Sequence, residues 1–186
     1  MKLGKIDYTW HFNAKVLLTG ALVAFAYGCS AQEICLESVG ARFGFNPFGA
    51  GHDFYQAEGF VNWNLPWRWD LGSSLNLQSR VDVSAGWLAE SGASAAIASA
   101  GPSLVLRKES FPLSLEAGLS PTELSRSDFR SKDFGIPFQF TSHGGLNFDI
   151  TSHICISYRF QHMSNASLSR HNPGLNLNML GLSYQF

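Results

Sequence analysis

Apolar and polar residues alternate with a period of two through most of the chain after residue 32. In residues 75–87 the odd positions are mostly Leu, Val, Ala and Trp, while the even ones include Asn, Gln, Arg and Asp. Because successive side chains of a strand point to opposite faces, this alternation predicts about eight strands of roughly ten residues or more. The expected turns between them are residues 46–53, 69–74, 90–94, 108–111, 121–132, 148–152 and 167–174.

Two all-β architectures accommodate such strands. A soluble β-sandwich usually has shorter strands and fewer aromatic rings on its exposed face. A transmembrane barrel turns a polar face toward its lumen, which here would hold Arg80, Asp82, Glu116 and Arg159. A closed barrel also pairs every backbone group, as lipid requires. We therefore predict an all-β fold, an eight-stranded antiparallel transmembrane β-barrel.

The two ends of the chain favour export to the bacterial outer membrane. Lys2, Lys5 and Lys15 accompany a short apolar run at 16–26, and small residues follow up to Ala31. This pattern predicts a signal peptide at residues 1–31 that is removed, leaving 32–186 as the barrel domain. An uncleaved anchor would need ~18–20 apolar residues, and a lipoprotein site at Cys29 is the other alternative. The last strand, with alternating Leu180, Leu182, Tyr184 and a terminal Phe186, resembles the closing strand of outer-membrane barrels.

Charge and cysteine content exclude several function classes. The net charge is −1 and only 15% of the residues are charged, so nothing predicts a nucleic-acid partner. After cleavage Cys35 and Cys155 remain, and they could pair or stay as thiols. No Cys/His spacing predicts a metal site, and no cofactor is expected.

His162 and Ser164 lie two residues apart at the end of an apolar stripe formed by Ile154, Ile156, Tyr158 and Phe160. All of these residues share one face of the predicted seventh strand. With both termini on the periplasmic side, odd strands run outward, so this face meets lipid near the outer leaflet. The Cβ atoms of His162 and Ser164 would lie roughly 6–7 Å apart.

Asn176 is an even number of residues away from the outward-facing positions of the final strand, so its side chain also faces outward. The final strand pairs with the seventh. Ester hydrolysis by a serine needs a base, a group that orients the base, and donors for the oxyanion. Ser164, His162 and Asn176 can supply the nucleophile, the base and the orienting group, on a surface that suits a lipid ester.

The carboxyl-terminal part of the chain resembles the outer-membrane lipid A 3-O-deacylases. The resemblance rests on the motif His162-x-Ser164-Asn165-Ala166, on residues 172–176 (Asn-Pro-Gly-Leu-Asn) and on a last strand that ends in Phe186. The resemblance implies that Ser164 is the nucleophile, His162 the general base and Asn176 the third member of a triad. It implies an oxyanion hole made by the Asn165 side chain and the backbone N–H of Ser167. Well-known members have Gly in place of Ser167 and Glu in place of Asn176.

The same resemblance implies a serine carboxylic-ester hydrolase that removes the 3-O-linked 3-hydroxyacyl chain of lipid A. Lipopolysaccharide would be its substrate, outer-membrane lipids its surroundings and the barrel-assembly machinery its partner in insertion. Assembly into a homodimer is left open by the sequence. The alternatives are a non-catalytic structural or lipid-binding barrel, and an esterase or phospholipase with another lipid substrate.

The remaining polar and aromatic candidates have structural interpretations. His171 is expected to be a solvated loop residue, or else a contact to lipid phosphate or sugar. His143 and Arg159 are expected to point inward and to pair with Asp82, Glu116 or other groups of the lumen. Four tryptophans read as aromatics of the membrane interface: Trp63, Trp67, Trp69 and Trp87.

Overall fold

The computed structural model describes residues 33–46 and 53–186. They form eight antiparallel strands closed into a barrel, in which each strand pairs with the next and the last pairs with the first. The strands are β1 (Cys35–Phe45), β2 (Phe54–Asp70), β3 (Leu75–Glu90), β4 (Ala93–Lys108), β5 (Leu113–Leu124), β6 (Phe138–Asp149), β7 (Ile154–Ser164) and β8 (Leu175–Gln185). The predicted fold class and strand number are confirmed, while the predicted signal peptide at 1–31 lies outside the described residues.

No helix in the described ranges is long and apolar enough to cross a membrane.

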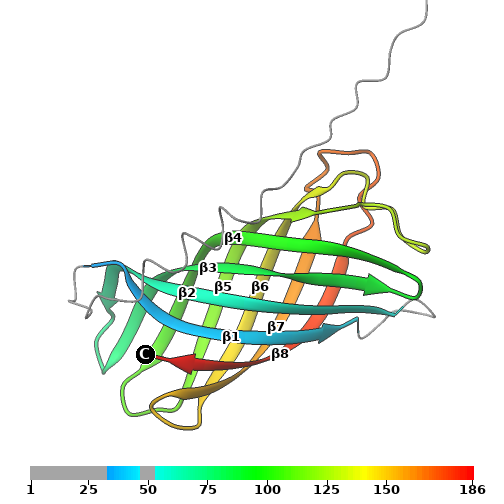
Figure 1. Ribbon diagram of the computed structural model, residues 1–186. Coiled ribbons are helices and arrows are strands. Elements are labelled where there is room, and N and C mark those ends of the chain that lie inside the picture. The colour runs from blue at the N-terminus through cyan, green and yellow to red at the C-terminus, as the bar shows by residue number, and fades with distance from the viewer. Residues whose placement is uncertain (1–32, 47–52) are drawn as a thin grey trace, which may run out of the picture.

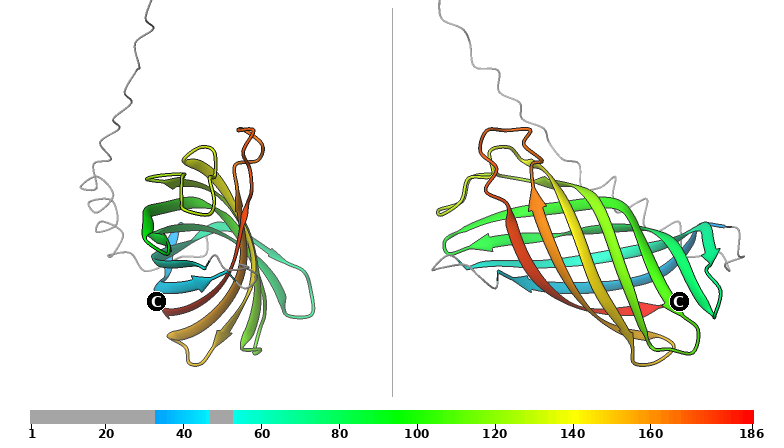
Figure 2. Two further views of the ribbon diagram at one scale, coloured as in Figure 1. Left: turned by 90° about the vertical axis from the view of Figure 1, so that its right-hand side faces the viewer. Right: turned by 180° about the vertical axis from the view of Figure 1, so that it is seen from behind.

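The two ends of the barrel differ in their loops (Figure 1). The carboxyl terminus and the short β2–β3, β4–β5 and β6–β7 connections lie at one end, which we call the terminal end. The β5–β6 loop (125–137) and the β7–β8 loop (165–174) rise side by side at the opposite end, as all three views show (Figure 2). His162 and Ser164 close β7 at this second end, as the strand count predicted.

The expected turn at 121–132 begins too early. Strand β5 continues to Leu124, and β6 begins at Phe138 rather than Ile136. The β4–β5 register is the same before and after a gap between the pairs Ser99↔Thr122 and Ser103↔Gly118. Pro102 and Pro121 lie in this gap. Since proline has no N–H to donate, the ladder is interrupted there without ending the strand.

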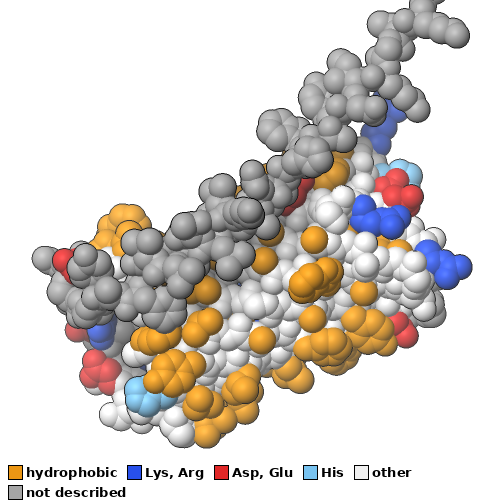
Figure 3. Space-filling model, in the orientation of Figure 1, with side chains coloured by type: hydrophobic (Ala, Val, Ile, Leu, Met, Phe, Trp, Pro, Cys, Tyr) orange, Lys and Arg blue, Asp and Glu red, His pale blue; other side chains and the backbone are white. Residues whose placement is uncertain are grey.

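Hydrophobic side chains dominate the outward face of the strands. In the space-filling view hydrophobic side chains are spread across the visible wall between uncharged polar side chains and backbone, and charged side chains gather toward its ends (Figure 3). On β7 the outward residues Ile156, Tyr158 and Phe160 are 41–44% exposed, while the inward Arg159 and Gln161 are buried. The predicted parity of this strand is therefore confirmed.

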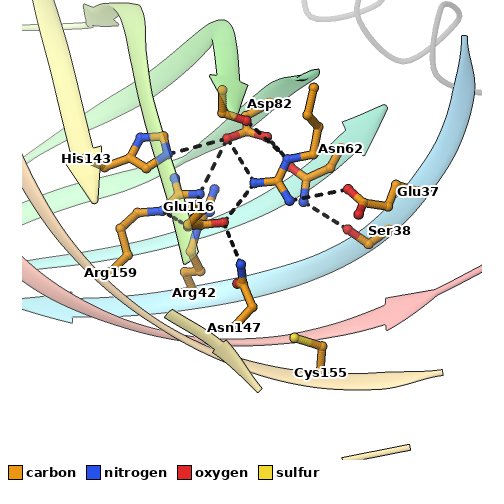
Figure 4. A network of polar contacts seen from close by, with 12 residues as sticks. Glu37, Ser38, Arg42, Asn62, Asp82, Glu116, His143, Asn147, Cys155 and Arg159 are labelled. Atoms are coloured by element: carbon orange, nitrogen blue, oxygen red, sulfur yellow. Dashed lines mark hydrogen bonds and ion pairs between the residues drawn. The ribbon is translucent and has the colours of Figure 1, made fainter. Parts of the chain in front are cut away.

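The lumen is filled by a network of buried charges (Figure 4). Glu116 accepts from Arg80 Nη2 and from Arg159, each at 2.8 Å. Asp82 pairs with Arg80 at 2.7 Å and lies 3.7 Å from His143 Nε2. The expected inward pairing of Arg159 is confirmed. His143 also points into the lumen, but its Nε2 makes no hydrogen bond among the described residues. Arg80, Arg159, Asp82 and Glu116 each have a partner of opposite sign, which is the condition for burying charge without a large penalty.

An apolar cluster closes the lumen at the end that carries the long loops. Phe54 of β2 contacts Phe129 and Phe134 of the β5–β6 loop, with ring centroids 5.4 and 6.1 Å apart. Met163 and Leu175 join the same cluster from β7 and β8. The inward neighbours of His162 and Asn176 are thus packed against a loop that sits over the barrel mouth.

Cys155 is a buried free thiol. The alternative in which it forms a disulfide with Cys35 is therefore excluded.

We expect Glu116→Ala to destabilise the barrel by about 3 kcal/mol, because it leaves the buried Arg159 without its nearest carboxylate. Glu109→Ala is the matched control, since Glu109 is exposed and 3.7 Å from Arg68. The measurement is the temperature at which the folded band is lost in detergent gel electrophoresis. Equal midpoints for the two variants would contradict the structural role of the network.

Candidate active site

The β7–β8 ladder places His162 directly opposite Asn176. Both side chains are on the outward, lipid-facing side of the wall, and both are exposed. His162 Nδ1 and Asn176 Oδ1 are 2.7 Å apart. The structure thus brings together two of the three predicted triad members through strand pairing alone.

This hydrogen bond selects one tautomer of His162. An amide oxygen only accepts hydrogen bonds, so Nδ1 must carry the proton. The ring then presents the lone pair of Nε2 to its surroundings. An oriented imidazole with an unprotonated Nε2 is what a general base requires.

Ser164 is the last residue of β7 and lies on the same face as His162. Its backbone pairs with Phe140 of β6, and its side chain is half-buried. Within residues 53–186 its hydroxyl has no hydrogen-bond partner. The strand therefore delivers a hydroxyl and an imidazole to one side of the wall, in the order expected from the sequence.

Gly174 allows the close approach of the β7–β8 loop to the histidine ring. Its φ is +61°, and a Cβ atom there would lie 2.9 Å from His162 Cε1. The carbonyl of Gly174 accepts a hydrogen bond of 2.6 Å from Lys132 Nζ of the β5–β6 loop. Burial holds the pKa of Lys132 below its usual value, with partial compensation by the Glu90 carboxylate. The two long loops are therefore joined next to the imidazole.

Asn165 has a different environment from the one that the resemblance implies. The side chain is fully buried, and Nδ2 donates to the carbonyls of Phe134 (2.9 Å) and His171 (2.6 Å). Its backbone N–H donates to Asn172 Oδ1 at 3.0 Å. In this conformation Asn165 joins the β7–β8 loop to the β5–β6 loop through its hydrogen bond to Phe134. To act as an oxyanion donor, the side chain would have to give up one of these bonds.

Ala166 and Ser167 both have left-handed backbone conformations, with φ of 51° and 64°. The turn is closed by the Leu168 N–H, which donates to the Asn165 carbonyl at 3.0 Å. Neither the Ala166 nor the Ser167 N–H has an acceptor among the described residues. These amides stay candidates for oxyanion donors, and a left-handed Ser167 explains why glycine suits this position.

No sequence pattern marks Lys132 or Phe134 as site residues: Lys132 ends the expected turn at 121–132, and Phe134 lies just after it. Both contact the β7–β8 loop only because the barrel brings two loops together. Other predicted residues lie as expected on the outside: His171 is exposed, and Trp67, Trp69 and Trp87 are among the exposed large hydrophobics. In the described ranges, no cluster of three or more His, Cys, Asp or Glu could hold a metal ion.

Residues 55–185 match the family model of the lipid A 3-O-deacylases, PagL. The chain belongs to this family. The lipid A deacylase PagL of Bordetella bronchiseptica (strain ATCC BAA-588 / NCTC 13252 / RB50) is 42% identical over 72 residues, which are 39% of this chain and 40% of that protein. The match thus spans about two fifths of the length of this curated relative.

The crystal structure of the outer membrane enzyme PagL is similar in fold. It has a TM-score of 0.68 and 21% identity, and the alignment covers 78% of this chain and 97% of that one. The predicted family and the predicted outer-membrane barrel are confirmed. The roles of individual site residues stay predictions.

We expect Asn176→Ala to redistribute the proton of His162. Loss of a hydrogen bond worth about 1 kcal/mol should lower the population of the Nδ1–H tautomer about fivefold relative to Nε2–H. Long-range ¹H–¹⁵N NMR of histidine-labelled protein in micelles reports the tautomer, and His162→Gln identifies the signal. A wild-type ring protonated at Nε2 would contradict the assignment.

Proposed function

We propose that the protein is a lipid A 3-O-deacylase that hydrolyses the ester of the 3-hydroxyacyl chain at the outer leaflet of the bacterial outer membrane. The observation that carries the proposal is the 2.7 Å contact of His162 with Asn176 on the outward face, with Ser164 two residues away. Family membership supplies the substrate class. A site on the lipid-facing wall meets an acyl ester without extracting the lipid from the membrane.

In the proposed mechanism the Ser164 hydroxyl attacks the ester carbonyl while His162 Nε2 accepts its proton. Negative charge develops on the carbonyl oxygen, which donors of the 165–168 turn would stabilise. Collapse of this intermediate releases the sugar hydroxyl, which takes the proton from His162. Water, activated by His162, then hydrolyses the acyl-serine and releases the 3-hydroxy fatty acid.

Asn176 has one of the two functions of a triad carboxylate. It accepts from Nδ1–H and holds the ring, as the asparagine does in Cys–His–Asn enzymes. It carries no charge with which to stabilise the imidazolium that forms during attack. We therefore expect a slower enzyme than one with a carboxylate at this position.

Replacing Ser164 by alanine should abolish deacylation, with a loss of at least about 10³-fold, because it removes the hydroxyl that attacks the ester carbonyl in the proposed mechanism. The measurement is mass spectrometry of lipid A from cells that express each variant. Ser169→Ala, in the β7–β8 loop that follows Ser164, is the control. Full activity of Ser164→Ala would make the nucleophile assignment wrong.

This experiment also separates the rival functions. Lipid A that is unchanged even with the wild type favours a non-catalytic barrel. Release of fatty acid from phospholipid with intact lipid A favours an esterase of different substrate.

Replacing Asn176 by glutamate should raise the deacylation rate at least about tenfold, because a carboxylate stabilises the imidazolium in the transition state. Asn176→Gln is the matched control, since it has the same added length without the charge. Initial rates with purified protein and lipid A in mixed micelles give the comparison. A rate for Asn176→Glu no higher than that for Asn176→Gln would contradict this role of charge.

A further inference from the structure

A polar pair interrupts the apolar wall just below the candidate site. The Tyr158 hydroxyl of β7 donates to Asn178 Oδ1 of β8 at 2.7 Å. Both side chains are on the outward face, and their neighbours on that face are Ile156, Phe160 and Leu180. A polar group directed at hydrocarbon is costly unless its hydrogen-bonding capacity is used.

The pair uses only part of that capacity. Asn178 Nδ2 has two hydrogens with no acceptor in the described chain, and the phenolic oxygen of Tyr158 keeps its lone pairs. The pair therefore offers both a donor and an acceptor at one point of the wall. A hydroxyl group, which both donates and accepts, matches this pair.

The pair lies in line with the candidate site. Asn178 is two residues from Asn176 on β8 and stands opposite Phe160, which is two residues before His162. Ser164 is thus four residues beyond the level of Asn178, or about 13 Å along the strand. If the Ser164 and Asn178 side chains lean toward each other along the strands, by about 2 Å each, the gap shortens to roughly 9 Å.

This distance fits a 3-hydroxyacyl ester. The carbonyl carbon stands about 3 Å from the attacking hydroxyl, which leaves about 6 Å. Two carbon–carbon bonds, one carbon–oxygen bond and a hydrogen bond together span 6–7 Å, roughly. Beyond Asn178 the same face continues as apolar surface, where Leu180 and Leu182 line a hollow of about 690 Å³.

We propose that Tyr158 and Asn178 form a specificity site that binds the 3-hydroxyl group of the acyl chain cleaved at Ser164. The proposal rests on the deacylase function proposed above. The substrate hydroxyl forms hydrogen bonds with Asn178 Nδ2 and with the phenolic oxygen of Tyr158. An ester without this hydroxyl leaves both groups without a partner in a lipid environment. Recognition of the hydroxyl also fixes the carbonyl at the height of Ser164.

The test compares two synthetic 3-O-acylated glucosamine phospholipids of equal chain length, one with a 3-hydroxyacyl ester and one without the hydroxyl. The wild type should favour the hydroxylated ester about tenfold in kcat/KM. Asn178→Leu should bring this ratio close to one, mainly by slowing hydrolysis of the hydroxylated ester. Tyr158→Phe, which keeps the amide, should lower the ratio about threefold.

Tyr184→Phe is the control, because Tyr184 is an outward tyrosine near the terminal end of β8 and should leave the ratio unchanged. Heat-modifiable gel mobility verifies that each variant folds. A wild-type ratio of one overturns the specificity site and leaves the deacylase intact. Equal slowing of both esters by Asn178→Leu also overturns it, since that is the effect of a structural residue. Hydrolysis of neither ester by the wild type overturns both proposals.

Discussion

The pairing of every backbone N–H and C=O group in lipid is the constraint on which this structure depends. It forces the eight strands to close, and closure fixes which residues face each other across β7 and β8. Because side chains alternate with a period of two, a slip of one residue would turn Asn176 into the lumen and leave His162 without its partner. The candidate site is in this sense a consequence of register.

The buried charges make the outward site possible. Arg80, Arg159, Asp82 and Glu116 satisfy one another inside the barrel, so the outer wall can be apolar apart from a few polar side chains. Three of them, Ser142, Asn176 and Asn178, lie at or next to the level of His162 on the neighbouring strands. The lumen is filled by side chains, and the candidate site lies on the outer face of the wall.

The site also depends on the two long loops at its end of the barrel. Lys132 and Phe134 bind backbone and side-chain groups of the β7–β8 loop, and the phenylalanines below them close the barrel mouth. These contacts hold the turn that follows Ser164. Asn176 supplies orientation to His162 without charge, so the rate of any reaction here depends strongly on how firmly this geometry is kept.

The sequence by itself determined the strand number, the faces of the strands and the outward placement of His162, Ser164 and Asn176. These follow from a period of two, which each strand carries locally. The sequence did not determine that Asn165 is buried or that Lys132 contacts Gly174. Nor did it determine the hydrogen bond between Tyr158 and Asn178. Each of these joins residues from different strands or loops, through side-chain directions that depend on neighbouring elements. The end of β5 was also decided by the fold, because pairing with its neighbours carried the strand past a proline that locally reads as a turn.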